Sequence, residues 1–336
     1  MPGVLDIWND NFWGLSEMTD AINILPYVPR MCEEQGIFAK EGISTTSVSL
    51  EYLNGTVYLV SNKPRGAPGD LVENDRRVGR AVNCLHLPVS GAVYADDVQN
   101  LRAFGQTTIA QTVQQRVNDK LAAMKRNILA TLEWLRVGAI KGVLLDADGS
   151  TEIFNIYTEF GIAEPEKDFD FSSDAKDVRV QCMELIRTIE GEIGGFPMTM
   201  VGVLCSDTWF DQLIQHTTVK EAYKNWTAAQ QLTQSFAYKT FDFGGCRFIN
   251  YRGSVSGNAY IPANTARAFP MGTDGLFKEY YAPANYEETV NTIGLPFYAK
   301  SEMMKFGKGR ELEVQSNPLM LCHRPQSCIK LTMTTA

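Results

Sequence analysis

The sequence predicts an α+β protein built around one long helix. Three observations predict it: an apolar stripe of helical period through residues 108–138, alternating β runs before it, and a buried strand followed by a capped helix at residues 198–214. Of the 336 residues, 44% are hydrophobic and 21% are charged, so one large or two ordinary domains can bury a substantial core. This composition excludes a disordered chain, a collagen and a coiled-coil rod.

Net charge and cysteine content disfavour several further classes of function. A net charge of -8 disfavours tight DNA binding, because phosphate binders usually carry a basic surplus. The seven cysteines are scattered without a C-x-x-C pair beside only three histidines, which predicts reduced, mostly buried thiols and neither a metal nor a cofactor. No apolar run is long enough to span a membrane, and the acidic start MPGVLDIWNDNF lacks the features of a signal peptide, so we expect an unprocessed cytosolic start.

The N-terminal 30 residues predict an arm. They are too short for a domain, and two prolines interrupt any continuous helix. Three aromatic side chains, Trp8, Phe12 and Trp13, need a surface to cover them. That surface can belong to a neighbouring subunit or to the same one, and the arm sequence leaves both open.

A hairpin and a charged loop follow the arm. In SVSLEYLNGTVYLVS, Asn54 and Gly55 lie between two alternating runs, which predicts a two-residue turn that pairs Tyr52 with Val57. The segment Ser61 to Arg80 has no apolar periodicity and is locally basic in an acidic chain. It is either a solvated loop or a projecting loop that seeks an acidic partner. Its basic residues are Lys63, Arg65, Arg76, Arg77 and Arg80.

The predicted helix 108–138 is the strongest local signal. Its apolar positions recur every three or four residues, and we expect it to end near Gly138 after about 45 Å. A strand, a turn at Asp148 and Gly149 and a second strand should follow it. Its apolar positions are Val113, Val117, Leu121, Met124, Ile128, Leu132 and Leu135.

The second half predicts a mixed α/β region and a β-rich tail. Residues 162–177 hold six acids and two lysines, and a helix should begin near Asp174. MTMVGVLC predicts a buried strand, and Ser206 or Asp207 should cap the next helix. ELEVQSNPLMLCHRPQSCIKLTM returns to β character.

Catalytic motifs are absent apart from one weak candidate. The sequence contains no phosphate-binding glycine loop, no nucleophile elbow and no metalloprotease motif. Cys205 lies between a buried strand and a helix N-terminus, where a thiol pKa can fall, and His216 follows as a possible base. The pair would lie at opposite ends of the same helix, so a structural cysteine is the expected role.

The order of these segments resembles the major capsid protein E family of tailed bacteriophages. The resemblance covers essentially the whole chain and rests on LSEMTDAINILPYVPR, QGIF, GISTTSVSLEY, NKPRGAPG, YADDVQNLRAFG, LRVGAIKGVLLDADGSTEIFNIYTEFGI and EVQSNPLMLCHRP. It implies the capsid protein fold that is named after phage Hong Kong 97. The implied parts are an N-terminal arm (1–38), an extended loop with the hairpin (39–100), a peripheral domain (101–164 and 291–336) with a spine helix at 108–138, and an axial α/β domain (165–290).

The resemblance also implies a function and partners. We expect a structural protein that self-assembles, through hexamers and pentamers, into the icosahedral head shell around packaged double-stranded DNA, without tight sequence-specific DNA binding. A separate scaffolding protein, a portal and a decoration protein are its implied partners, the host cytoplasm its place of assembly and the virion its destination. The arm aromatics and the basic loop residues are the expected inter-subunit contacts. Two alternatives stay open: an encapsulin-like cellular shell, and a cysteine hydrolase using Cys205.

Overall fold

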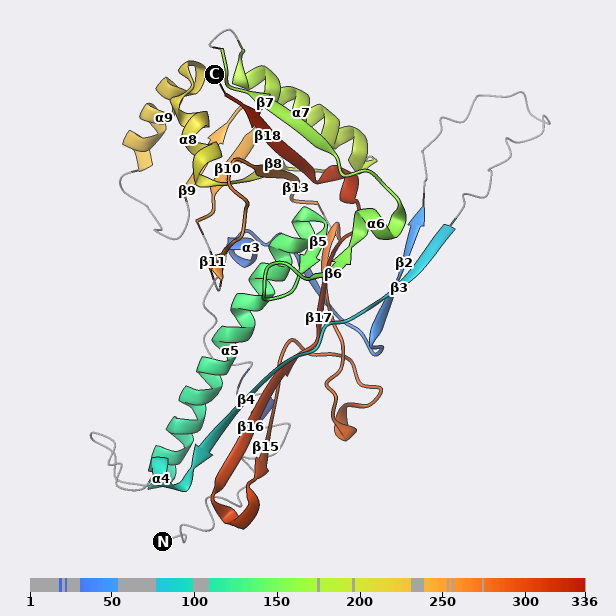
Figure 1. Ribbon diagram of the computed structural model, residues 1–336, viewed down its shortest axis with the longest axis vertical. Helices are drawn as coiled ribbons and strands as arrows, with labels where there is room; N and C mark the ends of the chain where they lie inside the picture. The colour runs from blue at the N-terminus through green and yellow to red at the C-terminus, as the bar shows by residue number, and fades with distance from the viewer. Residues whose placement is uncertain are drawn as a thin grey trace, which may run out of the picture. The chain divides into compact units, whose positions relative to one another are not determined.

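The computed structural model forms two compact units (Figure 1). The first lies within Met1–Val48, Asn83–Arg136 and Lys278–Met320, and the second within Ser49–Val82, Val137–Phe277 and Leu321–Ala336. Among the described residues, no helix is long and apolar enough to cross a membrane. The described residues are 18–19, 22, 31–53, 77–98, 109–173, 176–194, 197–230, 239–252, 254–255, 257–273 and 275–335.

The long helix α5 (Ile109–Lys141) confirms the strongest sequence prediction. Its apolar stripe is buried from Val117 to Leu135, as the three- and four-residue spacing requires. The predicted end at Gly138 is wrong by one turn. A Cβ at Gly138 would lie 3.0 Å from the carbonyl oxygen of Val143, so this glycine permits close packing inside the helix, and Gly142, at φ +77°, follows its last residue.

Two three-stranded sheets belong mainly to the first unit. Strand β16 lies between β15 and β4 and is antiparallel to both, whereas the other sheet has the order β1-β14-β17 with β1 parallel to β14. In β16, Leu312 and Val314 are buried while the alternating glutamates face the other side, which is the period expected of a half-buried strand. The elements are α3 (Met31–Glu34), β1 (Ala39–Gly42), β4 (Leu87–Tyr94), α4 (Ala95–Val98), β14 (Phe277–Tyr281), η2 (Glu287–Thr289), β15 (Tyr298–Met303), η3 (Lys305–Gly307), β16 (Gly309–Ser316) and β17 (Pro318–Cys322).

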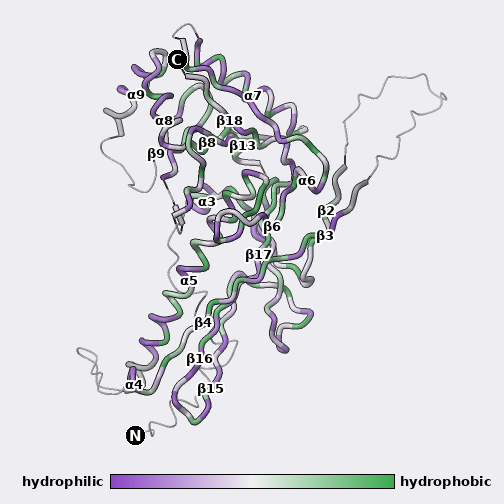
Figure 2. The backbone as a smooth tube through the Cα atoms, in the orientation of Figure 1, coloured by the Kyte–Doolittle hydropathy of each residue, from purple (hydrophilic) through white to green (hydrophobic). Residues whose placement is uncertain are grey.

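A mixed six-stranded sheet organises the second unit. Its order is β7-β18-β13-β8-β10-β9, and helices α7, α8 and α9 contribute to one apolar core on its face. Figure 2 shows hydrophobic residues in the central strands β8 and β13 and an alternation of hydrophobic and hydrophilic residues along α7. The sheet and helix elements are β7 (Glu166–Asp170), α7 (Val178–Ile193), β8 (Met200–Cys205), α8 (Asp207–Gln215), α9 (Thr217–Gln230), β9 (Lys239–Phe243), β10 (Cys246–Asn250), β13 (Ala266–Met271) and β18 (Ile329–Thr334).

Helix caps in the second unit follow local side-chain chemistry. Helix α7, expected to begin near Asp174, begins at Val178, and Asp177 caps it by accepting from the backbone N–H of Arg179 at 2.9 Å; Gly194 ends the helix in the left-handed region. Ser206 caps α8, which decides between the two predicted caps. Shorter elements complete the unit: β5 (Val143–Leu145), β6 (Glu152–Asn155), α6 (Ile156–Phe160), β11 (Ser254–Val255), β12 (Asn258–Ala259) and η4 (Pro325–Ser327).

The hairpin after α5 is confirmed in detail. Strands β5 and β6 are antiparallel, and the backbone N–H of Gly149, at φ +72°, donates to the carbonyl oxygen of Asp146 at 3.0 Å. The Asp148 carboxylate accepts from the backbone and hydroxyl groups of Ser150 and Thr151 at 2.6–2.9 Å. These bonds hold its pKa well below the ordinary range. The aspartate therefore stabilises a turn, as expected.

Strands β2 and β18 pair with segments far away in the sequence. Strand β2 (Ser47–Leu53) pairs with β3 (Arg77–Asn83), and the expected turn at Asn54 and Gly55 and the second strand of that hairpin, residues 57–59, lie outside the described residues. Residues 77–80, expected in a loop, belong to β3. Strand β18 lies between β7 and β13 in the six-stranded sheet, where its inward side chains, Ile329 and Leu331, are buried in the core to which α7 contributes.

Candidate interaction sites

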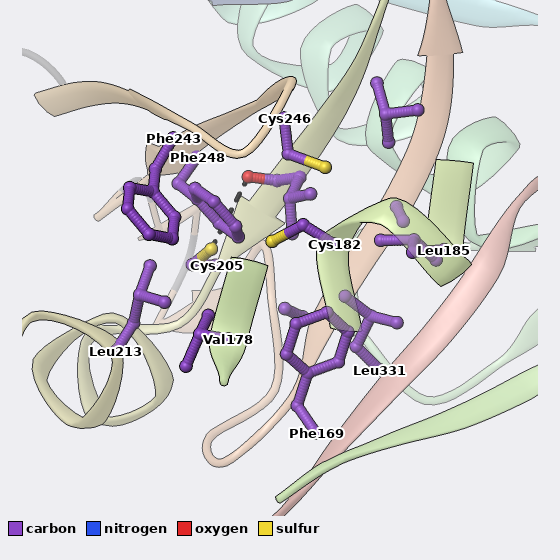
Figure 3. Packing of buried hydrophobic residues seen from close by; sticks show 14 of the residues in the cluster. Phe169, Val178, Cys182, Leu185, Cys205, Leu213, Phe243, Cys246, Phe248 and Leu331 are labelled. Carbon is purple, nitrogen blue, oxygen red and sulfur yellow. Dashed lines mark hydrogen bonds between the residues drawn. The ribbon is translucent and has the colours of Figure 1, made fainter. Parts of the chain in front are cut away.

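Cys205 has the environment of a core residue. It ends β8 and is fully buried, and its Sγ donates only to the carbonyl oxygen of Val203, at 3.5 Å (Figure 3). Burial raises the thiol pKa well above its ordinary value, so the sulfur stays protonated at neutral pH. The position before a helix N-terminus does not compensate for the loss of solvation.

The predicted base is engaged elsewhere. The Nδ1 atom of His216 lies 2.9 Å from the Thr218 hydroxyl, and Nε2 lies 3.3 Å from the carbonyl oxygen of Ser173. The histidine follows α8 while Cys205 precedes it, so one helix separates the two residues. The cysteine hydrolase hypothesis is therefore wrong: the candidate nucleophile is protonated and has no base.

The remaining cysteines are also reduced, as the sequence predicts. Cys182 and Cys246 face each other in the core (Figure 3), and their contact, together with burial, raises the pKa of Cys182. The sulfurs of Cys322 and Cys328 lie 3.6 Å apart, and both are buried. Within the described ranges, no cluster of three or more His, Cys, Asp or Glu side chains could hold a metal ion.

Most predicted contact residues fall outside the described residues. These are Trp8, Phe12, Trp13, Lys63, Arg65 and Arg76. Arg77 and Arg80 lie in β3, and the exposed Arg80 guanidinium is 3.9 Å from the carboxylate of Glu159 on α6. An exposed pair at this separation contributes little, so it leaves Arg80 available for other contacts.

Carboxylates of the acidic segment 164–177 already have partners within their own unit. Glu164 accepts a 2.5 Å bond from the guanidinium of Arg267, and Glu166 lies 3.4 Å from the ammonium of Lys330. Asp168 accepts from two threonine hydroxyls of β18, and Asp170 from the Ser172 hydroxyl. Much of the acidity that the sequence displays is thus neutralised or hydrogen-bonded inside the subunit.

A different acidic surface lies on the sheet β15-β16-β4. A groove of about 910 Å³ runs over this sheet, and four glutamates and one lysine are among its lining residues. Glu302 and Glu311 lie directly opposite each other on antiparallel strands, where like charges are destabilising. Both are exposed, and neither makes a hydrogen bond or ion pair with another described side chain. The charged lining residues are Glu287, Lys300, Glu302, Glu311 and Glu313.

Sequence reasoning missed this groove. The alternation in ELEV marks one acidic face of the last long strand, but Glu302 lies on a different strand and only the pairing register brings it opposite Glu311. Farther along the same register, Lys300 lies opposite Glu313; its ammonium pairs with Glu288 at 2.7 Å, and Glu313 accepts from the Tyr286 hydroxyl at 3.1 Å. The unbalanced charge is therefore concentrated at the Glu302–Glu311 end.

An ion cluster holds the N-terminal elements of the first unit to α5 and β14. The buried Arg136 guanidinium contacts Glu279 at 2.5 Å, Glu33 at 2.9 Å and Glu133 at 3.4 Å. Glu133 also accepts from the backbone N–H of Cys32 at 3.0 Å. These four charged residues, called the ion cluster below, join α3, α5 and β14, which are far apart in the sequence.

The whole length of the chain matches known proteins. A family model described as Phage major capsid protein E matches residues 14–333. The major capsid protein of Pseudomonas phage KPP10 is 27% identical over 342 residues, which cover 95% of this chain and 97% of the relative. That of Salmonella phage Felix O1 is 23% identical, with coverage of 93% and 94%. A crystal structure described as a capsid protein of an E. coli CFT073 prophage has a TM-score of 0.57 at 12% identity, covering 95% of this chain and 99% of the other, and shows a shared fold.

Proposed function

The chain belongs to the Phage major capsid protein E family, and from that premise we propose how its copies contact one another. It has the Hong Kong 97-like fold and is the major capsid protein that forms the head shell of a tailed phage. It is a structural component of the virion and not an enzyme. The family predicted from the sequence is confirmed, and neither the cellular-shell nor the hydrolase alternative is retained.

Finer parts of the expectation remain proposals. We propose hexamers and pentamers as the shell's capsomers, a separate scaffolding protein and a portal as assembly partners, and a decoration protein as a further candidate. The net charge of -8 supports a shell that encloses DNA without gripping it tightly. We propose that the first unit, which contains most of α5, is the peripheral domain. We propose that the second unit, with its six-stranded sheet, is the axial domain.

The basic loop 63–80 and the arm aromatics are our proposed inter-subunit contacts. Between Lys63 and Arg80 the formal charge is 5 minus 3, or +2, in a chain of charge -8. An extended loop that reaches a neighbour meets the same acidic surface at every equivalent position of a closed shell. Charges at such a contact guide encounter and fix register even where each pair contributes only about 0.2–1 kcal/mol.

The acidic groove is the better receptor for this loop. Segment 164–177 first suggests itself from sequence, yet its carboxylates already have partners within the subunit. Glu302 and Glu311 instead repel each other and make no bond with another described side chain. A basic side chain from a neighbour would relieve that repulsion. This like-charge pair is the observation that carries the proposal.

A charge-reversal experiment tests it. Arg76→Glu with Arg77→Glu should fold but yield fewer shells in cells that co-express the other head proteins. Glu302→Lys should stabilise the isolated subunit slightly, by about 0.2–1 kcal/mol, because it removes the repulsion, yet it should also reduce shell yield. Opposite effects on stability and assembly are not expected of a residue that acts only in folding.

Combination and control variants make the result specific. Adding Glu302→Lys and Glu311→Lys to the loop variant should partly restore assembly. Glu192→Lys, which changes an exposed acid on α7, is the matched control and should leave shell yield unchanged. Normal shells from the loop variant over a range of salt concentrations would show that the loop charges are only solvated.

A further inference from the structure

The turn between β15 and β16 exposes an aromatic side chain in an unfavourable backbone conformation. Residues 303–309, called the hairpin tip, include Phe306, which is 93% exposed and has φ +65°. A bulky residue rarely adopts this region, and an apolar ring in water gains nothing from folding. Met303 beside it is half exposed, and Lys305 and Lys308 flank the ring. The hairpin tip therefore presents exposed apolar side chains bordered by lysines.

A complementary surface lies in the same unit. Residues 290–295, called the ledge, expose Val290 by 66%, Ile293 by 70% and Leu295 by 43%. Two glutamates immediately precede it: Glu288 pairs with the ammonium of Lys300 at 2.7 Å, and the exposed Glu287 supplies the acidic border. Exposed apolar side chains gathered in six consecutive residues and bordered by charge are typical of a protein contact.

The ledge is held in place before any partner arrives. Its Gly294 N–H donates to the carbonyl oxygen of Ile43 at 2.9 Å, and the Leu295 N–H donates to the Tyr298 hydroxyl at 2.9 Å. At its N-terminal end, the Thr289 hydroxyl donates to the carbonyl oxygen of Ala284 at 2.6 Å. Rigid presentation lowers the entropic cost of docking.

The hairpin tip and the ledge do not cover each other within the subunit. Phe306 and Ile293 belong to one compact unit, and both remain largely exposed in it. Two exposed apolar surfaces with opposite flanking charges that do not cover each other in one subunit can cover each other between two copies. Such a head-to-tail contact generates closed rings when the rotation between copies closes.

We propose that the hairpin tip of one subunit docks on the ledge of a second copy, with the Phe306 ring against Ile293 and the tip lysines facing Glu287. The contact rests on self-assembly of the shell and shares Glu287 and Met304 with the lining of the acidic groove, but neither residue is changed in the loop or groove variants. It assigns a binding role to the strained tip, whose cost to the single subunit is recovered on assembly.

Replacing Phe306 by glycine tests the proposal without endangering the fold. Glycine accepts φ +65° readily, so the unassembled subunit should unfold at the same or a higher temperature. Shell yield, measured by sedimentation and electron microscopy after co-expression with the other head proteins, should fall by at least about tenfold because the buried ring is lost at every contact. Val180→Ser, at an exposed apolar position of α7, is the control and should assemble normally.

A cysteine pair identifies the partner surface. Subunits with Met303→Cys and Leu295→Cys, which keep the Phe306 ring and Ile293, should give disulfide-linked dimers and longer ladders in oxidised shells, whereas either single variant should not. Normal shell yield from Phe306→Gly would overturn the proposal. Loss of shells with Phe306→Gly but no cross-link in shells of the double-cysteine variant would overturn the ledge as partner. Failure of the Glu302 and loop variants to affect assembly would leave this contact standing.

Discussion

Replacing Arg136 by methionine should destabilise the first unit more than any exposed arginine change. The substitution keeps much of the side-chain volume but removes the guanidinium that contacts Glu33, Glu133 and Glu279 in the ion cluster. Glu133 and Glu279 are buried, so their carboxylates would lose their contact with this cation without gaining water.

The expected cost follows from this burial. Breaking a buried ion pair by removing one partner typically costs about 3–5 kcal/mol, and here one guanidinium serves two buried carboxylates. Glu33 is partly exposed and also pairs with Lys40, so it should contribute little to the loss. Glu279→Gln keeps a hydrogen-bonding partner for Arg136 and should cost less, about 1–3 kcal/mol.

Hydrogen exchange of the unassembled subunit measures the loss of stability at α5 itself. Amides of α5 between residues 114 and 136 should exchange at least about 100-fold faster in Arg136→Met, because each 1.4 kcal/mol corresponds to about tenfold. Arg116→Met changes an exposed arginine on the same helix and should alter exchange less than about threefold. An acceleration below about tenfold in Arg136→Met would refute the view that the ion cluster holds the helix in place.

Two further predictions concern Lys141 and Gly142, which lie at the end of α5 in the second unit. Burial and the charge of Arg267 lower the pKa of Lys141 to about 8, so the unfolded chain binds more protons between about pH 8 and 10.5 and stability should rise with pH there. The stability advantage of Lys141→Met over the natural chain should therefore shrink across that window in urea unfolding, and a constant advantage would contradict the shift. Gly142→Ala should cost about 2–4 kcal/mol, because its φ is +77° and the new Cβ would lie 2.5 Å from the ring of Tyr157. Gly36→Ala, with φ +60° and open space, should cost only about 1 kcal/mol, and equal costs would show that the ring contact relaxes freely.

Sequence periodicity predicted α5 well because the signal is local. Apolar residues three and four apart share one helix face in any tertiary setting, so the stripe from Val117 to Leu135 was bound to face a core. The position where the helix ends was not predictable in the same way. Gly138 and Gly142 are equally plausible end signals, and the approach of Val143 to Gly138 decides between them only after the chain has folded back.

Strand partners were harder to predict than strands. The β character of Ser47–Leu53 and Ile329–Thr334 is visible in their composition. Their pairing, however, depends on which other strand offers backbone N–H and C=O groups for hydrogen bonds and buries its apolar side chains on the same face of the sheet. The Asn54-Gly55 signal favoured a nearby partner for the first of these, and that turn lies outside the described residues, while the described partner is the more distant Arg77–Asn83.

The sequence alone determined the family, the main helix, the helix caps to within a few residues and the inert character of the cysteines, since each depends on composition or on neighbours within a few positions. Only the tertiary structure decided that Glu33, Glu133 and Glu279 surround one arginine, and that Glu302 faces Glu311. These residues come from separate elements, and their meeting depends on sheet register and chain reversal. Electrostatic energy depends on distance in space, which no local sequence pattern encodes.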